Sequence, residues 1–229
     1  MEIAPGVYSL TDNKGFEVHA FLIVEPSGLT LIDTLFNYNP VVIASQIFAI
    51  GRTLSDLNAI ILTHAHRSHL GGLAALKRLS GATVYAHEWE ADIISGERHA
   101  QCVSWTPQDP LVTYHYQIGN NLNLSVHPPC RVDSYLRGGE QLGSLEIIHT
   151  PGHSPGHLAF YHRGYRILFT GDAVVTSPKF MGGWPAFTLN RRQHLNSLKR
   201  LAEFESNILA VGHGEPVLDR GQERLKSLL

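Results

Sequence analysis

Cysteine is scarce in this 229-residue sequence, and the two that occur are far apart. Cys102 and Cys130 form no CxxC pair, so a cysteine-rich zinc site is excluded. Free thiols in a reducing compartment are therefore favoured over a disulfide between these two residues.

Other absences narrow the class of protein further. Eighteen lysines and arginines against twenty acidic residues give a net charge of −2, and no basic block stands out, which argues against a nucleic-acid partner. No apolar run reaches the roughly eighteen residues of a membrane-spanning helix, so no membrane partner is expected. The first residues lack the charged and apolar segments of a secretory signal, so we expect a cytoplasmic protein.

Histidine, in contrast, is abundant, with fourteen residues in the chain. His64, His66 and His69 follow directly on the apolar segment Ala59–Leu62. Side chains two positions apart on an extended chain point the same way, so His64 and His66 can bind one ion. Three imidazoles where a strand gives way to a helix predict a metal site.

Three later segments also place a histidine or aspartate next to glycine where a strand should end. They contain His153, Asp172 and His213. Glycine allows the backbone to turn sharply and to approach an ion closely. Imidazole and carboxylate ligands together suit zinc, iron or manganese, and the absence of cysteine ligands argues against a closed structural zinc site.

The apolar pattern predicts a mixed α and β chain in which both halves run through strands, a His or Asp at a strand end, and then a helix. Strands are expected at 7–10, 18–24, 29–33, 59–62, 83–86, 145–149, 157–161, 165–170 and 208–211, and helices at about 40–51, 70–79, 191–204 and 219–229. No low-complexity linker divides the chain. Residues 96–139 show no regular pattern, and a substrate lid, a small satellite core and a dimer contact all remain open for them.

The order of these motifs resembles that of the metallo-β-lactamase-fold hydrolases, which include glyoxalase II and the N-acyl homoserine lactonases. The resemblance extends over nearly the whole chain and rests on Leu31-Ile32-Asp33-Thr34, the His64–His69 cluster, Thr150-Pro151-Gly152-His153, Gly171-Asp172 and Gly212-His213-Gly214. It implies a single domain over residues 1–229, of the α+β class, folded as a four-layer αββα sandwich. The metal site would lie at one edge, between the two sheets.

The resemblance also implies a role for each residue of the site. His64, His66 and His153 would bind the first metal ion. Asp172 would bridge two ions and position the attacking hydroxide, while His69 and His213 would help to bind the second. One or two zinc ions per chain are expected, with iron or manganese as alternatives.

Ser68 departs from the pattern of this family, which has an aspartate immediately before the last histidine of the cluster. A serine hydroxyl is neutral near pH 7 and is a poor ligand. The second ion should therefore bind more weakly than the first. General-base assistance from a carboxylate is also lost at this position, which favours substrates with good leaving groups.

We therefore expect a metal-dependent hydrolase in which a metal-bound hydroxide attacks a small ester, thioester or lactone. A β-lactam is a weaker candidate because no export signal is visible. A mononuclear iron oxidoreductase of the persulfide dioxygenase type and a non-catalytic metal-binding or sensory protein remain alternatives. The substrate would be a small molecule, and a homodimer stays open.

Several other residues receive weaker expectations. The resemblance suggests that Asp33 supports the metal loops, and His157 is expected to have a structural role near the site. His87 is expected to begin a surface helix, with a place at the rim of the pocket as the alternative, and Phe180–Pro185 is favoured as pocket lining over simple packing. No ligand role is expected for His19, His99, His115, His127, His149, His162 and His194.

Overall fold

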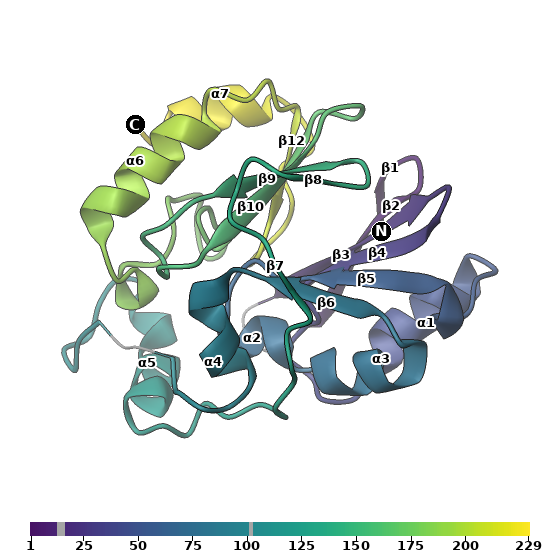
Figure 1. The fold of residues 1–229 in the computed structure, drawn as a ribbon. Helices are drawn as coiled ribbons and strands as arrows, with labels where there is room; N and C mark the ends of the chain where they lie inside the picture. The colour runs from purple at the N-terminus through teal and green to yellow at the C-terminus, as the bar shows by residue number, and fades with distance from the viewer. Residues whose placement is uncertain (13–16, 101–102) are drawn as a thin grey trace.

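The structure is a computed structural model that describes residues 1–12, 17–100 and 103–229. Cys102 lies outside these residues, whereas Cys130 is a buried free thiol. Two β-sheets pack face to face, and helices cover the outer face of each (Figure 1). This arrangement confirms the predicted α+β class and the αββα sandwich.

The first sheet contains seven strands in sequence order: β1 (Glu2–Ala4), β2 (Val7–Asp12), β3 (Val18–Glu25), β4 (Gly28–Ile32), β5 (Leu57–Ile61), β6 (Thr83–Ala86) and β7 (Ser134–Tyr135). Strands β4 to β7 run parallel, and the others pair antiparallel. The second sheet has the order β12 (Ile208–Val211), β11 (Ile167–Gly171), β10 (Leu158–His162), β9 (Leu145–His149) and β8 (Gln141–Leu142). Its β11–β12 pair is parallel.

Helices α1 (Val41–Ala49) and α3 (Leu73–Ser80) cover the first sheet, and α6 (Arg191–Leu201) and α7 (Gly221–Lys226) cover the second (Figure 1). The shorter helices are α2 (Arg67–Leu70), α4 (Ala91–Ile94) and α5 (Tyr114–Asn121), with 3-10 turns η1 (Leu54–Asp56), η2 (Glu88–Glu90), η3 (Leu111–Thr113) and η4 (Pro185–Phe187). No helix within the described ranges is both long and apolar enough to cross a bilayer.

The alternation of apolar side chains along each strand builds the layers. In β3, Leu22 packs with the helices on the outer face, while Phe21 and Ile23 pack between the two sheets. In β11, Phe169 joins the core between the sheets and Leu168 packs under α6 and α7. Successive side chains of a strand point to opposite faces, so each buried strand contributes to two cores.

Several segments differ from the expected elements, and β1, β7, β8 and α4 were not expected. The helix expected at about residues 70–79 is divided into α2 and α3, because Gly71 and Gly72 lie between them. Gly81, with φ +74°, ends α3 as a left-handed cap. Residues 111–121, for which no element was assigned, form η3 and α5.

The two sheets are joined by backbone hydrogen bonds at the edge where the candidate ligands lie. The amide of His19 donates to Gly212 O at 2.9 Å, and the amide of Leu158 donates to Thr63 O at 2.8 Å. The carboxyl ends of β4, β5, β6, β9, β11 and β12 all reach this edge. The loops that follow these strands are therefore held at fixed positions relative to one another.

Candidate metal centre

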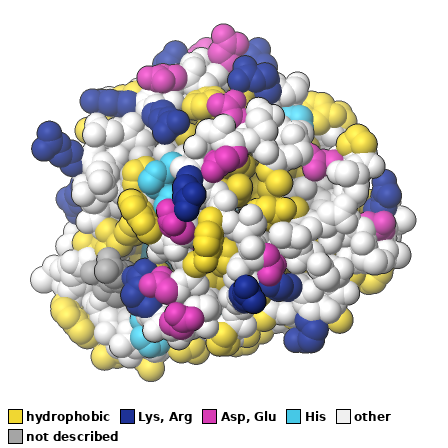
Figure 2. Space-filling view, viewed as in Figure 1, with side chains coloured by type: hydrophobic (Ala, Val, Ile, Leu, Met, Phe, Trp, Pro, Cys, Tyr) yellow, Lys and Arg dark blue, Asp and Glu magenta, His cyan; other side chains and the backbone are white. Residues whose placement is uncertain are grey.

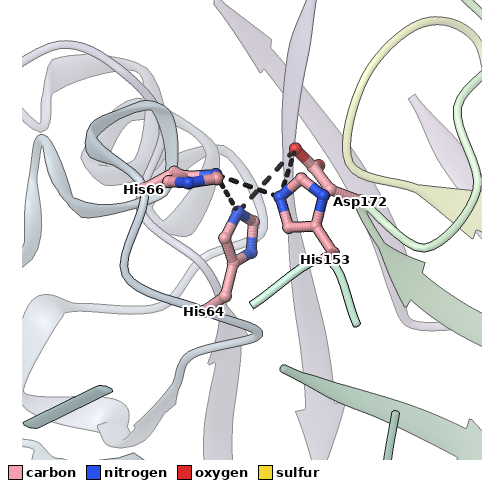
Figure 3. A group of neighbouring side chains, drawn as sticks. All are labelled: His64, His66, His153 and Asp172. Atoms are coloured by element: carbon pink, nitrogen blue, oxygen red, sulfur yellow. Dashed lines mark hydrogen bonds and ion pairs between the residues drawn. The ribbon is translucent and has the colours of Figure 1, made fainter. Parts of the chain in front are cut away.

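All six predicted ligand residues come together in two groups that share Asp172. The first group contains His64, His66, His153 and Asp172, and the second contains His69, Asp172 and His213. Within each group the candidate ligand atoms lie within 4.8 Å of one another. In Figure 3 the four side chains of the first group point toward one common centre.

The atoms of the first group have the spacing that a tetrahedral ion requires. His66 Nδ1 lies 3.0 Å from His64 Nε2 and 3.0 Å from His153 Nε2. Asp172 Oδ2 lies 3.7 Å from His64 Nε2 and 3.6 Å from His153 Nε2. Ligands at about 2.0–2.1 Å from a tetrahedral zinc ion are roughly 3.4 Å apart, so the four atoms fit one such ion.

The second group is built around the same carboxylate. His69 Nε2 lies 3.2 Å from Asp172 Oδ1, and His213 Nε2 lies 3.4 Å from Asp172 Oδ2. Apart from this contact with each other, the buried atoms His69 Nε2 and Asp172 Oδ1 have no hydrogen-bond partner within the described chain. Buried polar atoms normally have one, and a bound cation would satisfy both. A Cβ atom on Gly212 would lie 2.2 Å from Asp172 Oδ1, so glycine keeps this space open.

The electrostatics of the two groups differ. Burial lowers the pKa of His66 to about 4 and the pKa values of His64 and His153 well below their usual value. These three imidazoles are therefore neutral near pH 7, with lone pairs available for an ion. Burial also acts to lower the pKa of His69, but Asp33 and Asp172 outweigh it and raise that pKa to about 10. The carboxylates of Asp33 and Asp172 thus stabilise a positive charge at the second group.

Asp33 supports the cluster from the turn after β4. Its carboxylate accepts hydrogen bonds from Thr63 N at 2.8 Å and Thr63 Oγ1 at 2.7 Å, and it lies 2.9 Å from His69 Nδ1. With φ +58°, Asp33 adopts the left-handed conformation that aspartate tolerates better than most residues. These contacts match the supporting role that the resemblance implies.

His157 orients Asp172 without joining either group. The backbone N–H of Asp172 donates to His157 Nε2 at 3.2 Å, so that nitrogen is an acceptor. His157 Nδ1 lies 2.8 Å from Thr150 Oγ1 and can donate to it. Burial lowers the pKa of His157 to about 3, which keeps the ring neutral. This is the structural role that the sequence predicts.

Glu90 is a supporting residue that the sequence analysis missed. Its Oε2 accepts from Ala65 N at 3.0 Å, while its Oε1 accepts from Ser154 Oγ at 2.7 Å and from Gly156 N at 2.8 Å. Burial raises the pKa of Glu90, although these hydrogen bonds favour its ionised form. The side chain thus connects the loop that carries His64 and His66 with the loop that carries His153.

The only signal in the sequence for Glu90 is its place shortly after a strand. It follows β6 at the same edge as the ligand loops, but it lies in a segment whose polar residues are typical of an exposed helix start. His87 lies before Glu90 and begins η2 as predicted, yet the residue is only 4% exposed. Its ring stacks on that of His149, with ring centres 4.5 Å apart. The expectation of a surface position was wrong for His87 because His149 and Trp89 cover it.

A pocket opens over the two groups, and its wall is largely aromatic. Its lining includes Phe36, Tyr116, Trp184 and Phe187, together with Arg67, Ser68, Asn120 and Ser125. Tyr116, Asn120 and Ser125 come from residues 96–139, so this segment forms part of the wall. Trp184 confirms the preference for pocket lining within Phe180–Pro185, whereas Phe180 packs against the core under α6.

Comparisons with known proteins agree with this geometry. The model of the metallo-beta-lactamase superfamily matches residues 13–213. The chain is 30% identical to a probable metallo-hydrolase, YflN, of Bacillus subtilis (strain 168), over 94% of this chain and 86% of that protein. It is 31% identical to a hydroxyacylglutathione hydrolase of Aeromonas salmonicida (strain A449), over 67% of this chain but only 46% of that enzyme.

The fold is also similar to solved structures. A crystal structure of TTHA1623 in a di-iron-bound form superposes with a TM-score of 0.68 and 25% identity, over 92% of this chain and 94% of that one. The family match covers the predicted ligand segments from His64 to His213. This chain therefore belongs to the metallo-beta-lactamase superfamily.

Proposed function

We propose that the protein is a metal-dependent hydrolase that acts on a small ester, thioester or lactone. The observation that carries this proposal is the pair of ligand groups that share Asp172 at the floor of an aromatic pocket. Relatives named metallo-hydrolase and hydroxyacylglutathione hydrolase support the reaction class.

In this proposal His64, His66, His153 and Asp172 would hold one ion, and His69, Asp172 and His213 a second. A bound ion would polarise the substrate and lower the pKa of water toward about 7. Asp172 is oriented by its backbone hydrogen bond to His157, so its two oxygens face both groups. The imidazoles of the first group are neutral, so their nitrogen lone pairs can point toward the centre of the group. The carboxylate of Asp33 holds the ring of His69 in place in the second group.

Ser68 determines which substrates suit this site. It lines the pocket and brings no carboxylate that could pass a proton to the leaving group. The proton must then come from solvent, which slows the reaction least when the leaving group is already a weak base. Activated esters, thioesters and lactones should therefore react faster than amides.

A panel of chromogenic esters, thioesters and lactones tests the proposal. The metal-free protein would be assayed alone and with added zinc, manganese or iron, and its metal content measured by elemental analysis. Hydrolysis that depends on metal and consumes no oxygen is the expected result. Oxygen consumption with iron alone would instead indicate an oxidoreductase, and no turnover with metal bound would indicate a binding or sensory protein.

Replacing Ser68 by aspartate is expected to raise occupancy of the second group. The added carboxylate supplies an anionic ligand and should raise second-site affinity by about tenfold or more. Elemental analysis after dialysis against limiting zinc measures this as metal per chain. Ser68→Asn, similar in size but uncharged, is the control. Equal metal content in the wild type and Ser68→Asp would contradict our account of Ser68.

Zinc as the native metal and the cytoplasm as the location remain predictions, and a homodimer stays open. The imidazole-rich ligand set of the first group suits zinc, while the di-iron form of TTHA1623 keeps iron as an alternative. Elemental analysis of protein purified without added metal would decide between them.

A further inference from the structure

Arg67 places a positive charge in the wall of the metal pocket, next to Ser68. Its Nε donates to Val126 O at 2.7 Å and to Tyr38 Oη at 3.2 Å. Its guanidinium lies over the ring of Phe36, 3.7 Å from the ring centre. These contacts hold the guanidinium group in one orientation.

The terminal nitrogens of Arg67, Nη1 and Nη2, remain available to donate hydrogen bonds to a ligand. Its hydrogen bonds within the described part of the chain use Nε and neither Nη1 nor Nη2. Among the described residues that line the pocket, Asp172 is the acidic one, and it faces the histidines of both groups. An arginine side chain keeps its charge at any physiological pH, and its paired terminal N–H groups match a carboxylate or phosphate.

The described residues around Arg67 leave its positive charge without a nearby negative charge to balance it. Ser68 leaves this wall without the negative charge that an aspartate would bring. A neighbouring hollow shares Arg67 and Ser125 with the metal pocket and adds Arg98 and His99, and no described acidic residue lines it. Arg98 is paired with Asp92 at 2.6 Å, so Arg67 supplies the unbalanced charge.

Four aromatic side chains make up much of the remaining pocket wall, beside the polar residues Ser68, Asn120 and Ser125. Phe36 lies against the guanidinium of Arg67, while Phe187 and Trp184 contact the candidate ligands His66 and His213. A substrate that reached from the metal groups to Arg67 would therefore pass along aromatic side chains. A short hydrocarbon segment suits such a wall better than a polar one.

From these observations we infer that Arg67 forms an anion-binding subsite. The substrate would be a small ester or thioester whose acyl part carries a carboxylate or phosphate at the end of a short apolar segment. This inference rests on the proposed hydrolase function for the reaction, but the binding of the anion can be measured separately.

Two esters with the same leaving group test the preference. 4-Nitrophenyl hydrogen glutarate carries a terminal carboxylate, and 4-nitrophenyl valerate is an uncharged ester of the same chain length. The metal-loaded wild type should show a KM about tenfold lower for the charged ester, because a charge-assisted pair with arginine is worth about one order of magnitude in affinity. Arg67→Met should abolish this preference, and Arg67→Lys should keep part of it. Arg163→Met, which removes an exposed arginine paired with Glu146 at 3.0 Å, should leave the preference unchanged.

Calorimetric titration separates the subsite from the reaction. Glutarate and propyl phosphate would be titrated into metal-free and metal-loaded protein, with correct folding of each variant checked by circular dichroism. We expect metal-free wild type to bind at least one of the two anions, and Arg67→Met to bind it about tenfold more weakly or not at all. Binding of only one anion identifies its class.

The outcomes distinguish the two proposals. Binding that depends on Arg67 without hydrolysis of any ester would support the subsite and count against the hydrolase. Hydrolysis with the same ratio of KM values and the same anion binding in wild type and Arg67→Met would overturn the subsite alone.

Discussion

Replacing His66 by alanine is expected to abolish metal binding at the first group and, with it, most of the activity. His66 Nδ1 is the atom that lies 3.0 Å from both His64 Nε2 and His153 Nε2, so its loss leaves one corner of the tetrahedron open. Loss of a residue that only supports a ligand costs about 10–100-fold in metal affinity, and loss of a ligand should cost more. Elemental analysis and titration with zinc in the presence of a competing chelator would measure this change.

The matched control for this variant is His99→Ala. His99 is an exposed histidine that belongs to neither ligand group, so its replacement should leave the metal content unchanged. The turnover of the best substrate in the panel should fall by about a thousandfold or more in His66→Ala, since the chemistry depends on the ion. A His66→Ala protein that is folded and retains full metal content would refute the ligand assignment.

Replacing Glu90 by alanine is expected to destabilise the protein and loosen the first group together. The change leaves the buried donors Ala65 N, Ser154 Oγ and Gly156 N without their acceptor. Each unsatisfied buried donor costs about 1–3 kcal/mol, and a cavity adds to that cost, so the free energy of unfolding should fall by roughly 3 kcal/mol or more. Denaturant unfolding of the metal-free protein would measure this loss.

Glu90→Gln tests the charge separately from the volume. A glutamine amide retains one acceptor oxygen but turns an NH₂ group toward donors that already point at it. It should therefore be destabilising, though less than Glu90→Ala, and it should lower zinc affinity by about tenfold because the two ligand loops are no longer fixed together. Glu88→Gln removes an exposed carboxylate two residues away, which pairs with Arg137 at 3.1 Å, and should change neither property appreciably. Unchanged stability and zinc affinity in Glu90→Ala would show that Glu90 does not fix the loops.

Local sequence pattern was sufficient to select the candidate ligands. His64 and His66 are two residues apart on an extended segment, and this spacing alone brings them to one side of the chain. The candidate ligands His153, Asp172 and His213 follow strands, and strands that run in the same direction end at the same edge of a sheet. The six predicted ligand residues thus came from local periodicity and motif order, and they lie together in the folded chain.

Residues 111–121 illustrate where local pattern failed. The segment of α5 includes Gly119, Asn120 and Asn121, which are weak helix formers, and its apolar residues do not make a clear stripe. Contacts supplied by other parts of the chain compensate: Gln117 Nε2 donates to Thr106 O at 3.0 Å, and Tyr116 packs edge-on against Phe36. A helix that is stabilised mainly by contacts with other segments shows no clear helical pattern in its own sequence.

The sequence by itself determined the six candidate ligands, because they depend on residue identity and on spacing over a few positions. The order of its motifs, through the resemblance to a known family, also indicated the two-sheet fold and the departure at Ser68. Only the tertiary structure decided the role of Glu90, whose partners Ser154 and Gly156 lie more than sixty residues away, and the orientation of Arg67, whose partner Val126 lies fifty-nine residues away. Hydrogen bonds between residues so distant in sequence depend on how the loops meet after folding. The periodicity of a single segment therefore cannot predict these hydrogen bonds.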